Sequence, residues 1–98
     1  IVETTKKVKQ KEIERTTLKL DNHIGHLLEK IKYYDEELLP SISEQVSLLE
    51  KSFQQGEGSY MEYVMSLENE NEVRLEKLKM IQDFYLSSIE LKYWTANN

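Results

Sequence analysis

Two histidines are the residues of this chain best suited to chemistry. His23 and His26 stand three positions apart, with Asp21 and Glu29 nearby. Residues three apart are neighbours on a helix face, so this spacing is compatible with metal ligation. A structural metal site needs about four ligands, however, and two histidines do not supply them. We therefore interpret both as surface residues and expect no metal or other cofactor.

No side-chain arrangement in the sequence predicts catalysis. The chain has no cysteine, and no nucleophile stands beside a plausible base. The turn Gly56-Glu57-Gly58 is not a phosphate cradle, because no lysine follows it and Glu57 adds a negative charge. Paired carboxylates are plentiful, but on solvated helices they indicate solubility. We expect the protein not to be an enzyme.

The composition predicts an all-α chain of one domain. Of 98 residues, 39% are hydrophobic and 32% charged, with three glycines and one proline, which leaves little material for loops. The net charge of −5 has both signs interspersed, and the basic stretch 6–11 is followed at once by Glu12 and Glu14. We therefore expect no nucleic-acid partner. No apolar run approaches the ~20 residues of a membrane-spanning helix.

Residues 53–63 predict a reversal between two long helices. Gly56 can adopt the left-handed conformation that ends a helix, and Ser59 with Glu62 forms a capping box that starts the next one. The sequence thus predicts an antiparallel helical hairpin, coiled-coil-like, with a helix over about 4–55, a turn over 56–59 and a helix over about 60–95. The chain starts in the middle of a helical pattern, so we expect it to be a fragment of a larger protein.

Apolar residues in both predicted helices repeat with a period of eleven, which favours nearly straight packing. In the first helix they are Leu20, Ile24, Leu27, Ile31, Leu38, Ile42, Val46, Leu49 and Phe53. In the second helix the same cycle gives Val64, Leu67, Asn71, Leu75, Leu78, Gln82, Leu86, Ile89 and Tyr93. Counting outward from the turn pairs Phe53 with Tyr60, Val46 with Leu67, Leu38 with Leu75, and Leu27 with Leu86.

A second apolar set lies outside this predicted seam. It comprises Leu28, Tyr33, Tyr34, Leu39 and Leu48 in the first helix, and Tyr63, Val73, Met80, Phe84, Leu91 and Trp94 in the second. Two helices cannot bury two stripes each. We expect either further helices alongside or self-association.

Pro40 falls inside the first helical pattern. It removes one backbone hydrogen bond, yet the apolar stripe passes it without losing phase. The sequence therefore predicts one helix bent near Pro40 rather than two separate helices.

Glu62 has two possible roles. It can cap the second helix together with Ser59. It can also line an opening at the tip of the hairpin, where Glu57 adds a second negative charge and cations would be favoured.

Several segments resemble the TolC-type outer-membrane efflux family. These are Leu39-Pro40 within a helix, Phe53-Gln54-Gln55-Gly56, the run from Gly58 to Val64, and the final Tyr85-Leu86, Ile89-Glu90-Leu91 and Tyr93. The resemblance covers roughly residues 20–97 and is nearest to the heavy-metal (Cus/Czc-like) branch.

This resemblance implies a trimeric channel in the outer membrane of a Gram-negative bacterium, with a β-barrel and a periplasmic tunnel of helices. Such channels work with an inner-membrane pump and a periplasmic adaptor to export small molecules or metal ions. Gly56, Glu57, Gly58 and Ser59 would form the adaptor-contacting tip, and Glu62 would match an acid at the pore entrance. The family often has a second acid one turn on, where this chain has Met65.

The alternative is an antiparallel coiled-coil interaction module or the hairpin of a periplasmic adaptor. That alternative predicts a complete folded unit with few exposed aromatic side chains. A channel segment instead predicts self-association that buries residues such as Phe84 and Trp94.

Overall fold

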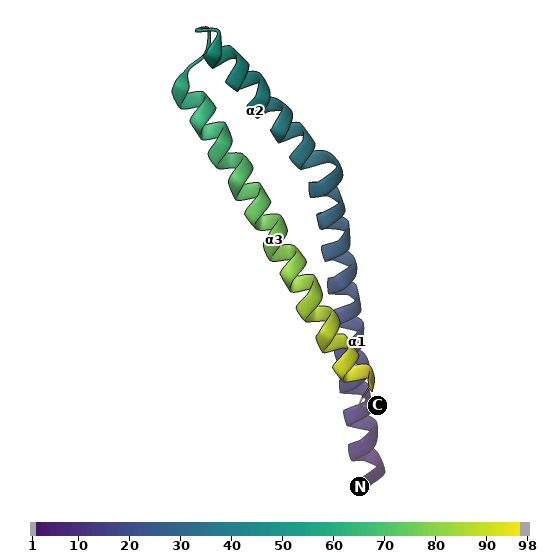
Figure 1. The fold of residues 1–98 in the computed structure, drawn as a ribbon. Coiled ribbons are helices and arrows are strands. Elements are labelled where there is room, and N and C mark those ends of the chain that lie inside the picture. Colours follow the sequence, from purple (N-terminus) through teal and green to yellow (C-terminus); the bar gives the residue numbers. More distant parts are fainter. Residues whose placement is uncertain (1, 97–98) are drawn as a thin grey trace.

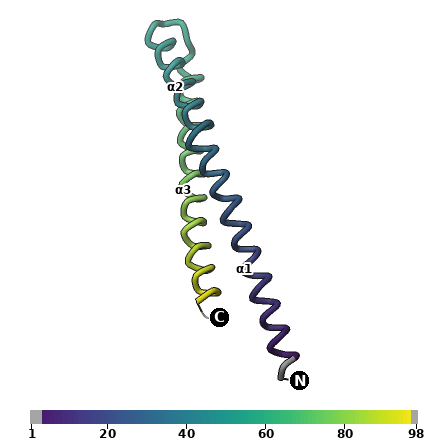
Figure 2. The backbone as a smooth tube through the Cα atoms, turned by 90° about the vertical axis from the view of Figure 1, so that its right-hand side faces the viewer, coloured from purple at the N-terminus to yellow at the C-terminus, as the bar shows by residue number. Residues whose placement is uncertain are grey.

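The computed structural model describes residues 2–96, which form a helical hairpin without strands (Figure 1). The first arm consists of α1 (Val2–Tyr33), a π-helical turn η1 (Tyr34–Leu38) and α2 (Leu39–Gln54). The second arm is α3 (Tyr60–Ala96). The molecule measures 78 × 19 × 16 Å. Figure 2 shows the two arms running side by side from the turn, with α1 continuing beyond the end of α3.

The first arm bends at η1, directly before Pro40. The Leu39 N–H donates to the Tyr34 carbonyl, five positions back, where an α-helix would use the carbonyl four positions back. Pro40 has no N–H, and its ring crowds the carbonyl four residues before it, so the wider turn gives the ring room. Tyr33, Leu38 and Leu39 keep right-handed helical angles. The arm thus changes direction while remaining helical (Figure 1).

The buried core is small and lies on the tip side of this bend. It contains Leu39, Ile42 and Val46 of α2 and Val73 of α3. Half-buried side chains pack against it: Tyr34, Leu38, Tyr63 and Leu67. Because two helices enclose little volume, none of the large side chains in residues 4–96 is fully buried.

The predicted stripe of the first arm faces α3. Leu27, Ile42 and Val46 are buried. Half-buried members of the same stripe are Leu20, Ile24, Ile31, Leu38 and Leu49. At the turn, the rings of Phe53 and Tyr60 lie 5.4 Å apart, which confirms their predicted pairing.

The predicted stripe of the second arm is wrong beyond its first turns. Val64 and Leu67 are half-buried, but the later apolar members are 52–64% exposed: Leu75, Leu78, Leu86, Ile89 and Tyr93. The side of α3 that faces the first arm carries residues expected outside the seam, namely Tyr63, Val73, Met80, Phe84, Leu91 and Trp94. The pairings of Leu38 with Leu75 and of Leu27 with Leu86 therefore do not form.

Polar contacts between the arms explain this choice of face. Ser43 donates to a Glu70 carboxylate oxygen at 3.0 Å, and Lys77 pairs with Asp35. Glu70 and Lys77 lie on the same side of α3 as Val73. Turning the predicted stripe inward would break these contacts, and the hairpin gains both apolar burial and polar pairing from the observed face.

Val73 and Leu75 provide a matched test of the observed face. Val73→Ala should lower the free energy of unfolding by about 1.5 kcal/mol, since two buried methyl equivalents are lost at about 0.8 kcal/mol each. Leu75→Ala removes an exposed side chain and should change it by less than about 0.5 kcal/mol. Urea unfolding followed by circular dichroism in dilute protein measures both. A larger loss of stability for Leu75→Ala than for Val73→Ala would instead support the seam predicted from the sequence.

Candidate functional site

The tip of the hairpin is closed by backbone hydrogen bonds onto the end of α2. Gly56 has a φ of 76°, the left-handed conformation predicted for it. Its N–H donates to the Phe53 carbonyl at 3.0 Å, and the Glu57 N–H donates to the Ser52 carbonyl at 2.9 Å. This pair of bonds is a Schellman motif, which satisfies carbonyls left free at the helix end.

Gly58 lies against the same helix end. Its N–H donates to the Ser52 carbonyl at 3.1 Å. A Cβ atom at position 58 would lie 2.9 Å from the Ser52 Cβ and 3.2 Å from the Phe53 backbone nitrogen. Position 58 therefore has no room for a side chain, and the tip depends on both glycines for different reasons.

Ser59 starts α3 as predicted. Its hydroxyl accepts a hydrogen bond from the Glu62 N–H at 3.4 Å, and its carbonyl accepts one from the Tyr63 N–H at 3.2 Å. Among the described residues 2–96, the reciprocal bond, in which the Ser59 N–H would donate to the Glu62 carboxylate, is not formed. The capping box is therefore half made, which leaves the carboxylate of Glu62 available for another role.

The two acids of the tip present negative charge to solvent. Glu57 and Glu62 are both exposed, and no ion pair within the described part of the chain involves either. Glu62 also borders an open hollow of about 360 Å³ between the arms, lined further by Gln45, Leu49, Met65, Ser66 and Asn69. The tip is thus acidic, compact and accessible, which suits recognition of a basic or polar surface.

Both predicted surface histidines are exposed, but His23 makes a contact that the sequence pattern did not predict. Its Nε2 lies 3.0 Å from a carboxylate oxygen of Asp83, whose other oxygen accepts a hydrogen bond from Ser87 at 3.1 Å. His26 is outside this contact. Within the described residues, no group of three or more His, Cys, Asp or Glu side chains is placed to hold a metal ion. His23 instead joins the two arms.

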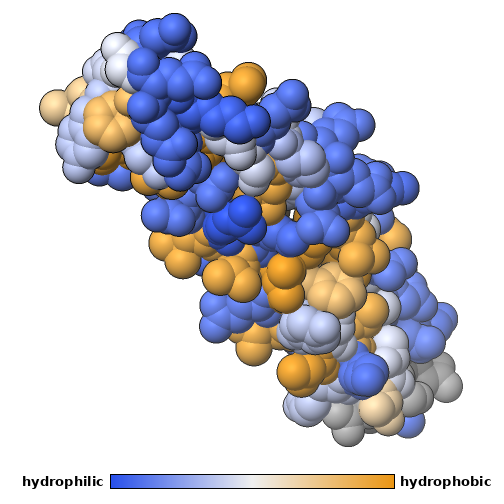
Figure 3. Space-filling view, turned by 45° about the horizontal axis from the view of Figure 1, so that its top comes forward, coloured by the Kyte–Doolittle hydropathy of each residue, from blue (hydrophilic) through white to orange (hydrophobic). Residues whose placement is uncertain are grey.

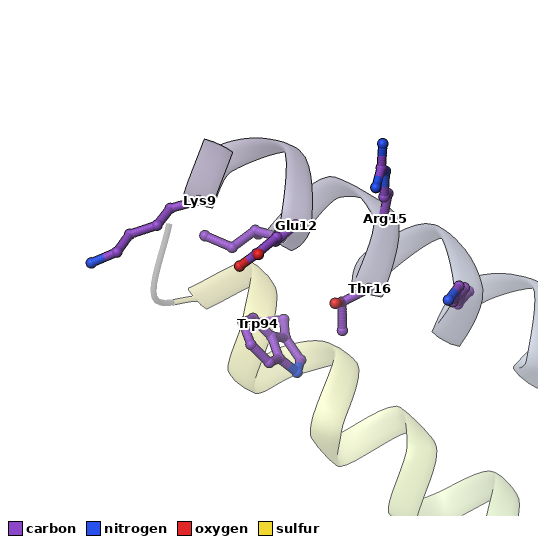
Figure 4. Close-up of a pocket in the computed structure, with 7 residues that line it drawn as sticks. Lys9, Glu12, Arg15, Thr16 and Trp94 are labelled. Atoms are coloured by element: carbon purple, nitrogen blue, oxygen red, sulfur yellow. The ribbon is translucent and has the colours of Figure 1, made fainter. Parts of the chain in front are cut away.

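Another hollow lies where α1 passes the end of α3 (Figure 4). It has a volume of about 510 Å³ and is lined by Lys9, Glu12, Ile13, Arg15, Thr16, Lys19 and Trp94. In Figure 4 the Trp94 indole lies against α1, while Lys9 and Arg15 extend away from it. The hollow is open to solvent, unlike the deep clefts that bury most of a small-molecule ligand. The half-buried Trp94 side chain lies next to α1 here. The sequence pattern instead places Trp94 in the second apolar set, outside the predicted seam.

Tyr34 ties the bend to the second arm. Its hydroxyl donates to a Glu76 carboxylate oxygen at 2.9 Å. This hydrogen bond, followed by partial burial and the negative charge of Glu76, raises the pKa of Tyr34 above its usual value.

Because the pKa is higher in the folded protein, the contribution of Tyr34 to stability is fully present below about pH 10 and is lost as the pH rises through the folded-state pKa. Thermal unfolding between pH 8 and 11.5 should show a steeper loss of stability above pH 10 for the native chain than for Tyr34→Phe. Parallel curves for the two proteins would contradict this contribution. Tyr33→Phe, at the exposed neighbouring ring, is the matched control.

The two glycines of the tip should respond differently to substitution. Gly56→Ala should cost about 1–2 kcal/mol, because alanine disfavours a positive φ although space is available. Gly58→Val should cost more, since the side chain would displace the end of α2. Chemical unfolding measures both, with Gly25→Ala as a control at an open helical position. Equal tolerance at positions 25 and 58 would contradict the close approach.

No match to this chain is found among protein-family models, curated proteins or solved structures. Within residues 2–96, no helix is both long and apolar enough to cross a membrane. Any function proposed for the chain therefore depends on its residues and their geometry. The relevant features are an acidic tip closed by two glycines, two arms joined by polar contacts, and an α3 helix with apolar side chains on two faces.

Proposed function

We propose that this chain is a periplasmic wall segment of a trimeric, TolC-type outer-membrane efflux channel. The observation that carries the proposal is the double apolar character of α3. One face covers the first arm, and the other exposes Leu75, Leu78, Leu86, Ile89 and Tyr93. A helix that is apolar on two sides needs neighbours on both, as in the closed wall of a helical tunnel.

The shape of the hairpin supports the same function. Its length of 78 Å, compared with widths of 19 and 16 Å, suits one element in the wall of a long tunnel better than a compact domain. In the first arm, the apolar positions that face α3 repeat every eleven residues, a period that favours nearly straight packing, as a tunnel wall requires. Figure 3 shows hydrophobic surface left open along the molecule between hydrophilic regions.

In this proposal the tip of the hairpin marks the periplasmic entrance. Gly56, Glu57, Gly58 and Ser59 form the surface that contacts the periplasmic adaptor, and the accessible carboxylate of Glu62 lies at the pore entrance. The half-made capping box supports both roles of Glu62, because its backbone N–H caps α3 while its carboxylate faces solvent. The exported cargo would be small molecules or metal ions, driven by an inner-membrane pump of the same assembly.

A second candidate function is an antiparallel coiled-coil interaction module or an adaptor hairpin. The observation in its favour is that Phe84 and Trp94 are half-buried against the first arm within a single chain. Against it stand four tyrosines that remain more than half exposed: Tyr33, Tyr60, Tyr85 and Tyr93. A self-sufficient module would leave fewer large aromatic side chains in solvent.

Charge reversal at Glu57 in the full-length protein tests the channel function. The Glu57 side chain is exposed, and this residue helps to close the turn only through its backbone N–H, so Glu57→Arg should preserve the fold. We expect reduced tolerance of the producing cells to exported compounds or metal ions, with unchanged amounts of trimer in the outer-membrane fraction. Glu44→Arg, exposed on α2 away from the tip, is the matched control.

Two results would contradict the proposal. The first is a full-length protein absent from the outer-membrane fraction. The second is unchanged tolerance in Glu57→Arg cells that carry normal amounts of trimer, which would remove the adaptor-contacting role of the tip. Gly58 is unsuitable for this experiment, because its substitution disturbs the turn itself.

A further inference from the structure

The side of α3 that faces away from the first arm forms a largely apolar surface, called here the outer face. Its members are Asn71, Leu75, Leu78, Gln82, Leu86, Ile89 and Tyr93, all of them exposed. From Leu75 to Tyr93 it extends about 27 Å, at 1.5 Å per residue. Exposed apolar surface of this extent on a helix is typical of an interaction site.

Charged residues border the outer face with opposite signs on its two sides. Glu72 and Glu90 are eighteen positions apart, which is five helical turns, so they lie on one side. Arg74 and Lys92 have the same spacing and lie on the other side, because residues two positions apart do not share a helix face. All four are exposed, and Arg74 also forms an ion pair with Glu70 of its own helix at 3.6 Å. The outer face therefore has an acidic border and a basic border, each marked near both of its ends.

This arrangement is complementary to itself. When two copies of α3 pack in parallel with their outer faces together, the acidic border of each copy lies against the basic border of the other. Glu72 then approaches Arg74 of the second copy, and Glu90 approaches its Lys92. The two-fold symmetry repeats both pairs, and Leu75, Leu78, Leu86 and Ile89 each meet their own equivalents.

We infer that the outer face binds a second copy of this chain in a parallel, two-fold dimer with both tips at the same end. An antiparallel pair is less favourable, because it sets each border against itself and leaves Lys79 with Glu90 as its attractive charge pair. The inference concerns the 98-residue chain by itself and does not rest on the channel proposal, in which neighbouring helices of the wall would cover the same face instead. Two copies with tips at one end are nevertheless the orientation that a channel wall would use.

The expected affinity follows from the size of the contact. A strip of this length buries on the order of 1,000 Å² in total, at the lower end of specific interfaces, so we expect dissociation in the micromolar range. Sedimentation equilibrium over a hundredfold concentration range should show a monomer–dimer equilibrium. A chain that stays monomeric at millimolar concentration, or that forms trimers, would overturn the inference.

Reversal of charge at one end of the outer face tests the parallel register. Glu90→Lys and Lys92→Glu should each raise the dimer dissociation constant about tenfold, because two attractive pairs become repulsive. The double variant exchanges the two charges and should return the constant to within about threefold of the native value. Lys79→Glu is the matched control, since in the parallel pair Lys79 has no acid opposite it, whereas in an antiparallel pair it would approach Glu90.

Two results would overturn the parallel arrangement. One is a double variant that remains as weak as either single variant, and the other is a Lys79→Glu effect larger than that of Lys92→Glu. Circular dichroism shows whether each variant keeps its helical content. Since all these residues are exposed, loss of folding would not explain a selective change in dissociation.

Introduced thiols provide an independent readout, because the chain has no cysteine. In the parallel dimer the two copies of position 71 lie next to each other, so Asn71→Cys should form an intermolecular disulfide readily. In an antiparallel dimer they would be separated by about 40 Å. Asn69→Cys, exposed on another side of α3, should cross-link slowly. Equal rates at the two positions would contradict the proposed interface.

Discussion

The structure depends on one constraint: the first arm can cover only one side of α3. Both sides are apolar enough to pack, so hydrophobic burial alone does not decide between them. The polar contacts Ser43–Glu70 and Lys77–Asp35 select the observed side. Once that side is turned inward, the remaining apolar residues of α3 must face solvent or another molecule, and this exposure is the basis of both proposals made for the chain.

Local features of the fold were predictable because their causes are local. Gly56 and Ser59 act through the backbone within a few residues, so the turn and the start of α3 could be read from the sequence. Pro40 was correctly expected to bend the arm without ending it. That the bend takes the form of a π turn before Pro40 was not predicted, since it depends on where the neighbouring arm holds Tyr34.

The orientation of α3 could not be predicted from its own pattern. Its two interleaved apolar sets both have helical spacing, so the pattern does not show which set faces the first arm. That orientation depends on pairs such as Ser43 with Glu70, which are distant in sequence. The same holds at the candidate site. The exposure of Glu62 was open to two interpretations, and the contact of His23 with Asp83 required knowledge of which side of α3 faces the first arm.

The closed tip also has a kinetic consequence. Contacts next to the turn, such as the rings of Phe53 and Tyr60, join residues near in sequence, whereas His23 and Asp83 meet only after a long loop has closed. Loop-closure entropy therefore favours formation of the tip first, with the arms zipping together away from it. The rigid bonds from Gly56, Glu57 and Gly58 onto the end of α2 make this short segment the natural folding nucleus of the hairpin.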